Sequence, residues 1–385
     1  MTVHTAVQVS AGVNPPVAAV SEEYVEVSVT LRIRGDFLTE HHPRSAHIVG
    51  VLVGQPTAGV SQAIASELPI RFVDGDGRLK SIVETAVPCA SLSDALERFS
   101  DWVSKNEIEG AHLLIFVSRS TIENGDRLGD RVETLRNHGG RADVFGTTPS
   151  LDFRLLGQVA LMSGGRFYVG ERRWLKDAGD CLRRQKERRF YGARLGITLT
   201  SNLIPVNAFR LDPAPLHLRD FQVQPASQTC WFDLPEMSSS QDETTWLLRC
   251  LAPRKKAGEY RLLDYQLVGQ TAAGPVTMTG TVAHMASASP AESSQVDARV
   301  EVEVDKARAT HWVESVGQAY VRGDGGKIVS TFAPFMQHES LNGRPENAAR
   351  LWSLKGELIR GGYFGLKELN TLWCLAQGVE LDASD

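Results

Sequence analysis

Apolar and polar residues alternate near the start of the chain. Residues 22–34 read EEYVEVSVTLRIR, with apolar side chains at nearly every second position. A period of two is typical of a strand that buries one face in an antiparallel sheet. Residues 3–9, VHTAVQV, show a weaker alternation before the NPP sequence. We therefore expect residues 1–40 to contribute paired antiparallel strands.

Between residues 41 and 175 the apolar residues gather in dense runs instead. Four such runs, HIVGVLVG, PIRFV, HLLIFVS and ADVFGT, are typical of strands buried on both faces of a parallel sheet. The segments between them place apolar residues at helical spacing, as in SLSDALERFSDWVSKN and RLGDRVETLRNHGG. Paired glycines close several of these segments and stop their helices. Strands alternating with helices predict an α/β fold with a doubly wound, mainly parallel sheet.

The rest of the chain divides into three further parts. Residues 176–192 predict a basic linker helix between domains. Period-two runs over residues 193–304 predict an antiparallel β-sandwich whose last strand is VDARVEVEV. Four apolar stripes at helical spacing over residues 305–385, separated by short Gly- or Asn-containing loops, predict a C-terminal helical bundle.

Composition narrows the classes of partner and compartment. The chain has 385 residues, with 41 Lys and Arg against 46 Asp and Glu, so its net charge of −5 offers no general attraction to nucleic acid or anionic lipid. Its five cysteines are scattered and show no metal-ligand spacing, which is typical of reduced thiols. No apolar run approaches the ~20 residues that span a bilayer, and no secretory leader pattern is present. We expect a cytoplasmic protein.

The stretch from His112 to Tyr168 carries a resemblance to a known family. A buried strand ends in a short polar loop (His112–Ser118), a second strand reaches VFG (Val144–Gly146), and a Pro-Ser-Leu-Asp loop leads into a helix that ends in GGRFY (Gly164–Tyr168). In combination these features resemble the second half of a von Willebrand factor A domain. The β-rich and helical flanks are similar to those of larger bacterial proteins of this family. The resemblance implies a von Willebrand A sheet inserted into the sandwich.

The family binds Mg²⁺ at a metal-ion-dependent adhesion site, built from an Asp-x-Ser-x-Ser loop, a Thr and a further Asp at the carboxyl ends of the sheet strands. In this chain VGQPTAG stands in place of the first loop, and the Thr and Asp places fall on or near Ser91 and on Ser118. Those positions supply no carboxylate, whereas Mg²⁺ requires oxygen ligands with enough negative charge to offset its dehydration. The resemblance therefore implies a degenerate metal site with no bound cofactor.

The same loops remain candidates for a partner-binding surface. The positions assigned to it are Gly54, Gln55, Thr57, Ser91, Ser118, Ser120, Asp126 and Asp152. The resemblance implies a non-catalytic scaffold or adaptor, whose protein partner is an AAA+ ATPase or another component of a bacterial stress, defence or regulatory system. No HExxH, GxSxG or P-loop pattern indicates an enzyme. The alternative is a cation-dependent sensor that binds Mg²⁺ or Ca²⁺ through Asp126, Asp130 or Asp152 together with the hydroxyls.

Two other motifs have a simpler structural interpretation. Asp74 and Asp76 in VDGDGRLKS loosely resemble a Ca²⁺ loop but lack its later ligands, so we expect a tight turn there. The basic segment from Arg183 to Arg194 suits either a phosphate-binding patch or the solvated face of a linker helix. The negative net charge favours the solvated face.

Overall fold

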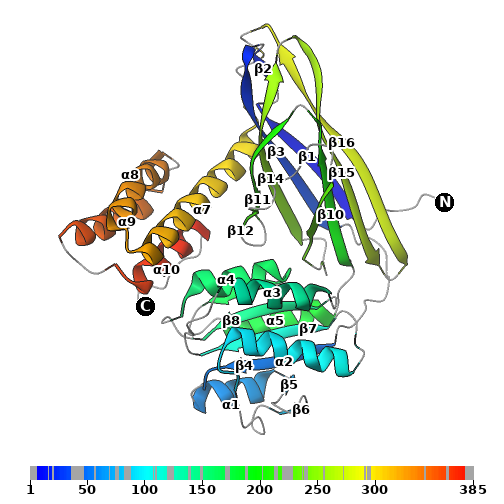
Figure 1. The fold of residues 1–385 in the computed structure, drawn as a ribbon, viewed down its shortest axis with the longest axis vertical. Helices are drawn as coiled ribbons and strands as arrows, with labels where there is room; N and C mark the ends of the chain where they lie inside the picture. The colour runs from blue at the N-terminus through cyan, green and yellow to red at the C-terminus, as the bar shows by residue number, and fades with distance from the viewer. Residues whose placement is uncertain are drawn as a thin grey trace. The chain divides into compact units, whose positions relative to one another are not determined.

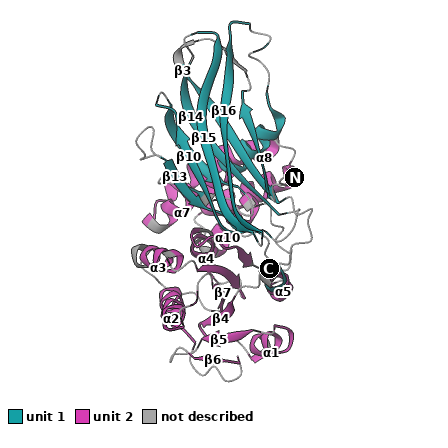
Figure 2. Ribbon diagram, turned by 90° about the vertical axis from the view of Figure 1, so that its right-hand side faces the viewer, with its two compact units in different colours: residues 1–46, 181–307 teal, residues 47–180, 308–385 magenta. Residues whose placement is uncertain are grey.

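The computed structural model describes most of the chain. The described residues are 7–15, 17–19, 21–35, 47–55, 58–68, 70–73, 78–81, 88–106, 108, 111–118, 125–137, 140–147, 151–169, 174–186, 190–201, 203–211, 216–218, 229–235, 237, 242–254, 256–271, 273–289, 292, 296–341, 344–360 and 364–377. The chain forms two compact units, one of residues 1–46 and 181–307 and the other of residues 47–180 and 308–385 (Figure 2).

A six-stranded sheet forms the centre of the second unit. In spatial order its strands are β6 (Leu79–Lys80), β5 (Arg71–Val73), β4 (Ile48–Val53), β7 (His112–Val117), β8 (Arg141–Gly146) and β9 (Phe167–Val169). Neighbouring strands are parallel except β6, which runs antiparallel to β5 at the edge. The helices that alternate with these strands are α1 (Ala58–Glu67), α2 (Leu92–Lys105), α3 (Gly125–Asn137), α4 (Phe153–Met162) and α5 (Trp174–Lys186) (Figure 1).

The two faces of this sheet bury different kinds of side chain. Aliphatic residues of β4, β7 and β8 pack on one face against α2, α3 and α4. Aromatic rings cross the other face: Phe116 stacks on Phe145 at 5.1 Å between ring centroids, and Phe72 lies 5.9 Å from Phe116. Phe72 extends over β4 because Gly50 has no side chain there, and a Cβ at Gly50 would lie 2.5 Å from the Phe72 ring. Dense burial on both faces explains why these strands have no alternating pattern.

Two five-stranded sheets form the first unit. One has the order β1 (Val7–Asn14), β3 (Ser21–Gly35), β14 (Glu243–Arg254), β11 (Ile204–Arg210) and β12 (Leu216–His217). The other has the order β13 (Thr229–Asp233), β10 (Tyr191–Leu199), β15 (Gly258–Thr271), β16 (Gly274–Ser287) and β2 (Val17–Ala19). Alternate residues such as Val29, Leu31 and Ile33 are buried in one core with Leu195, Trp246 and other residues of both sheets. The predicted fold class, a doubly wound sheet with an antiparallel sandwich and C-terminal helices, is confirmed.

The prediction that VDARVEVEV forms the last strand of the sandwich is wrong, because helix α7 (Ala298–Arg322) begins in this segment. The Val-Glu alternation imitates a strand, but the apolar residues that become buried, Val300, Val304 and Ala307, recur at helical spacing against Phe209 and Leu247. Asp297 favours the helix, since its Oδ1 accepts the backbone N–H of Arg299 at 2.9 Å.

The C-terminal part contains α7 and the helices α8 (Gly325–Leu341), α9 (Pro345–Ile359) and α10 (Leu366–Gln377). Their apolar stripes meet in one cluster that includes Val316, Phe332 and Leu351, as the helical spacing predicted. Across the described residues, no helix combines the length and the apolar character needed to cross a bilayer.

Candidate functional site

The carboxyl ends of β4, β7 and β8 lie side by side at one edge of the parallel sheet. Val53 pairs with Val117, and Val117 pairs with Gly146. The next residues continue this ladder: the backbone N–H of Ser118 donates to the carbonyl of Val53, and that of Thr147 donates to the carbonyl of Val117, each at 3.0 Å. Doubly wound sheets place their ligand sites at such an edge.

Gly54 turns the chain at the end of β4. Its φ angle of 73° lies in the left-handed region that favours glycine. Its N–H donates to the carbonyl of Cys89 at 3.0 Å, and the N–H of Cys89 donates to the carbonyl of Leu52 at 2.7 Å. These bonds bring the loop that carries Ser91 beside the end of β4. Gln55 is exposed next to the turn, and α1 begins at Ala58.

Three hydroxyl groups in the described part of this edge hydrogen-bond to the backbone. Ser118 Oγ donates to the carbonyl of Val53 at 3.2 Å, and the buried Thr147 Oγ1 donates to the carbonyl of Val117 at 2.9 Å. Ser91 Oγ accepts the N–H of Asp94 at 3.1 Å and so caps helix α2. Each hydroxyl fixes a strand end or a helix start.

Asp152 has a similar structural role at the start of α4. Its Oδ1 accepts the N–H of Leu155 at 3.1 Å, which is a helix cap. The residues on both sides are held by α10, because Asn370 Nδ2 donates to the carbonyl of Leu151 at 2.8 Å and Asn370 Oδ1 accepts the N–H of Phe153 at 3.3 Å. The sequence offered no signal for this tether, which joins residues about 220 positions apart.

Six of the eight predicted positions have a described backbone, and five of these six also have a described side-chain environment. Among them, Gly54 and Ser118 lie at neighbouring strand ends, and the Cys89 bonds bring the Ser91 loop beside them. Thr57 and Ser120 lie outside the described residues, as does the side chain of Asp126, whose backbone is in α3.

The described donors at this edge do not fit a magnesium ion. Asp152 is the one carboxylate among the predicted positions whose side chains are described, and it caps α4. Nowhere along this edge do the described residues bring three His, Cys, Asp or Glu side chains within ligating distance of one another. Neutral hydroxyls alone do not offset the cost of dehydrating Mg²⁺. Asp130 of the alternative set is exposed on α3.

Cys89 lies beside the end of β4, and its thiol is buried. Burial raises the pKa of the Cys89 thiol to about 11, with Arg98 lowering it and Asp94 raising it to smaller extents. Because the thiolate is the reactive form, this shift leaves little of the Cys89 thiol in its reactive form at neutral pH.

The other motifs from the sequence have separate outcomes. Asp74 and Asp76 lie outside the described residues. The basic segment is divided between two elements, since α5 ends at Lys186 and Arg194 lies in strand β10. The Arg194 guanidinium is 3.4 Å from the Asp233 carboxylate and 5.4 Å from the centroid of the Trp231 ring, and Phe190 is fully buried. Arg194 and Phe190 therefore have structural partners.

No protein-family model and no curated protein sequence matches the chain. Among solved structures it is similar to a von Willebrand factor type A protein from Catenulispora acidiphila, with 10% sequence identity, a TM-score of 0.74 and coverage of 99% of each chain. It is also similar to the ArnB paralog VWA2 from Sulfolobus acidocaldarius, with 12% identity, a TM-score of 0.57 and coverage of 97% of this chain and 99% of that one. The human COPII-coat protein Sec24c shows 10% identity and a TM-score of 0.51 over 90% of this chain and 60% of that one.

At these identities the likeness concerns the fold. It extends over 99% of the chain in the Catenulispora protein and so includes the parallel sheet, the sandwich and the helical tail. The chain therefore has the fold of a von Willebrand factor type A protein.

Proposed function

We propose that the carboxyl edge of the parallel sheet is a metal-free docking surface for a partner protein. The von Willebrand A fold supports a domain that binds proteins or other ligands. The observation that carries the proposal is that the hydroxyl groups of Ser91, Ser118 and Thr147 hydrogen-bond to the backbone and so fix its course at this edge. Gln55, at the same edge, is exposed. The surface is thus shaped in advance of binding, which lowers the entropic cost of association.

In this proposal the protein is a non-catalytic scaffold or adaptor. Its partner is a component of a multi-protein system, with an AAA+ ATPase as the first candidate. The Cys89 thiol beside the edge is buried and its pKa is raised, so this thiol is poorly suited to nucleophilic catalysis there.

Thermal unfolding in Mg²⁺, Mn²⁺ and Ca²⁺ tests the metal-free part of the proposal. The expected result is the same melting temperature in each cation and in EDTA. The Ser118→Ala variant removes the hydroxyl at the strand end, and Ser353→Ala on α9 is a matched control on an exposed helix. A cation-dependent rise of several degrees that Ser118→Ala abolishes and Ser353→Ala keeps would support the cation-dependent sensor instead.

Site-specific photocrosslinking tests the docking part. A photoreactive residue at Gln55 is expected to join one partner, equally well with and without EDTA, and the same residue at the exposed Trp352 of α9 serves as the control. Equal crosslinking from both positions would contradict docking at the carboxyl edge.

A further inference from the structure

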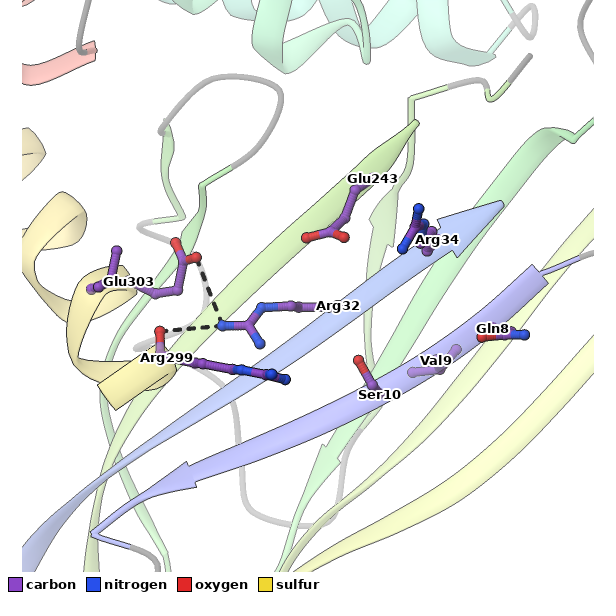
Figure 3. A pocket seen from close by; sticks show the side chains of 9 residues that line it. Gln8, Val9, Ser10, Arg32, Arg34, Glu243, Arg299 and Glu303 are labelled. Atoms are coloured by element: carbon purple, nitrogen blue, oxygen red, sulfur yellow. Dashed lines mark hydrogen bonds and ion pairs between the residues drawn. The ribbon is translucent and has the colours of Figure 1, made fainter. Parts of the chain in front are cut away.

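The first unit has a pocket on the outer face of the sheet that contains β1, β3 and β14. Its volume is about 550 Å³, and it lies where helix α7 begins (Figure 3). Arg32 and Arg34 of β3 face it, since the intervening Ile33 is buried in the sandwich core on the opposite face. Arg299 of α7 lines it from the other side.

The pocket carries more positive than negative charge. Arg32, Arg34 and Arg299 line it against two carboxylates, Glu243 and Glu303, so the lining has a net charge of three minus two, or +1. Glu303 is already engaged, because its Oε1 is 3.8 Å from Arg32 and its Oε2 is 3.3 Å from Lys306 outside the lining. The field in the pocket therefore favours an anionic group, and arginine binds carboxylates with two parallel hydrogen bonds.

The Arg32 side chain is held by a backbone contact. The Arg32 guanidinium donates to the carbonyl of Arg299 at 3.2 Å, which joins β3 to the first turn of α7. The start of α7 is fixed to β1 in turn, because Asn14 Nδ2 donates to Glu301 at 2.6 Å and Asn14 Oδ1 accepts the N–H of Asp297 at 3.4 Å. The side chains of Arg34 and Arg299 are exposed at the mouth.

The pocket lies beside an edge strand. Within the described part of the chain, β1 pairs on one side with β3 and forms the end of its sheet. Its sequence, VQVSAGVN, contains no charged residue and no proline, the features that usually protect sheet edges from further pairing. Ser10 is exposed on β1 and lines the pocket. A strand added beside β1 would point alternate side chains toward the same face.

We infer that this edge binds an extended acidic segment of a partner protein, which pairs with β1 and places carboxylates toward Arg34 and Arg299. The end position of β1 among the described strands of its sheet favours a peptide over a small anion, because a small anion would use the arginines alone. The site is separate from the carboxyl edge of the parallel sheet and does not depend on the function proposed there.

Binding of short synthetic strands tests this inference. The probe is a fluorescent octapeptide of alternating Val and Glu, measured by anisotropy against the full chain. The matched controls are alternating Val-Gln and Val-Lys octapeptides. The Val-Glu peptide is expected to bind at least tenfold more tightly than either control, with an affinity that falls as salt rises. Equal binding of the Val-Gln peptide would overturn the inference.

Two pairs of substitutions distinguish binding by the pocket arginines from a general effect of positive charge on the surface. Arg34→Gln with Arg299→Gln removes two exposed cations from the pocket, and Lys256→Gln with Arg261→Gln removes two from the β14–β15 hairpin and β15. The first pair is expected to weaken binding at least tenfold and the second less than twofold, with both unfolding at the wild-type temperature. An equal loss from both pairs would contradict the site.

Amide hydrogen exchange separates strand addition from simple ion binding. The Val-Glu peptide is expected to slow exchange in residues 7–14 of β1. If the peptide leaves exchange in β1 unchanged and citrate displaces it fully, the pocket binds small anions and the inference is wrong.

Discussion

The side-chain amide of Asn370 donates a hydrogen bond of 2.8 Å to the backbone carbonyl of Leu151. Leu151 is fully buried, and it precedes the helix start at the carboxyl edge of the parallel sheet. A residue of the C-terminal tail therefore helps to hold a loop of the candidate docking surface. Trp373 extends the same contact, since its ring lies 5.5 Å from that of Phe167.

Replacing Asn370 with Asp is expected to lower the free energy of unfolding by about 1–3 kcal/mol. The change keeps the acceptor for Phe153 but loses the donor, so a carboxylate faces the buried carbonyl of Leu151. Urea unfolding measures the loss. Thr371→Ala on the same helix removes one exposed hydrogen bond and is expected to change stability by less than about 0.5 kcal/mol. Similar losses in the two variants would refute the tether.

Glu339 is a buried carboxylate whose partners lie around the start of α9. It accepts bonds from Arg344 at 2.7 Å and from Asn347 at 2.9 Å, and it is 1% exposed. Glu339→Gln removes the charge that both bonds use, and we expect a loss of about 2–4 kcal/mol in chemical denaturation. Glu346→Gln makes the same change at an exposed position of α9 and should cost no more than about 1 kcal/mol. Comparable losses would show that Glu339 has no special role.

Gly50 lies under the Phe72 ring, and the two residues set the spacing of the aromatic face. An alanine Cβ at position 50 would approach the ring to 2.5 Å, and Phe72 is 1% exposed. Gly50→Ala is therefore expected to destabilise the fold by about 1–3 kcal/mol through overpacking. Gly129→Ala, in helix α3 with open space around it, should stabilise by up to about 1 kcal/mol. Thermal unfolding of both variants checks the opposite signs.

The raised pKa of the Cys89 thiol leads us to expect a loss of stability at high pH. Burial raises its pKa in the folded protein to about 11 from the value of 9.0 of a free thiol. Between these pH values the folded state holds a proton that the unfolded state has lost, so rising pH favours unfolding by about 1.4 kcal/mol per pH unit. Cys89→Ala should remove this part of the slope. Urea unfolding of both proteins at pH 8–11 tests it, and parallel curves would be the contrary result.

The architecture was predictable where burial imposes a clear period. The dense runs of β4, β7 and β8 and the alternation of β3 each have one physical cause, burial on two faces or on one. The prediction was wrong for residues 296–304, where Val and Glu alternate although the residues that matter recur at helical spacing. Val302 shows why, since it is 55% exposed on α7. Local alternation cannot reveal which valines meet the sheet.

The candidate site was predictable as a set of loop positions at strand ends. The family resemblance pointed to Gly54, Ser91 and Ser118, and in the structure each directly follows a strand or precedes a helix. The role of each hydroxyl depends on which carbonyl lies opposite, and that requires the register of β4 against β7. The Asn370 tether and the pocket at Arg299 depend on contacts between distant segments, which no local pattern encodes.

During synthesis, strand β3 leaves the ribosome long before β14, the strand with which it pairs. The Arg249 Nε on β14 donates to Glu26 on β3 at 2.7 Å, although the two residues are 223 positions apart. At typical ribosome speeds of about 5–20 residues per second, that separation takes roughly 10–45 s to complete. Throughout this interval Val27, Val29 and Leu31 lack the β14 side of their sheet. The time for which these apolar side chains stay uncovered in the nascent chain is therefore set by how fast the intervening residues 36–242 are translated.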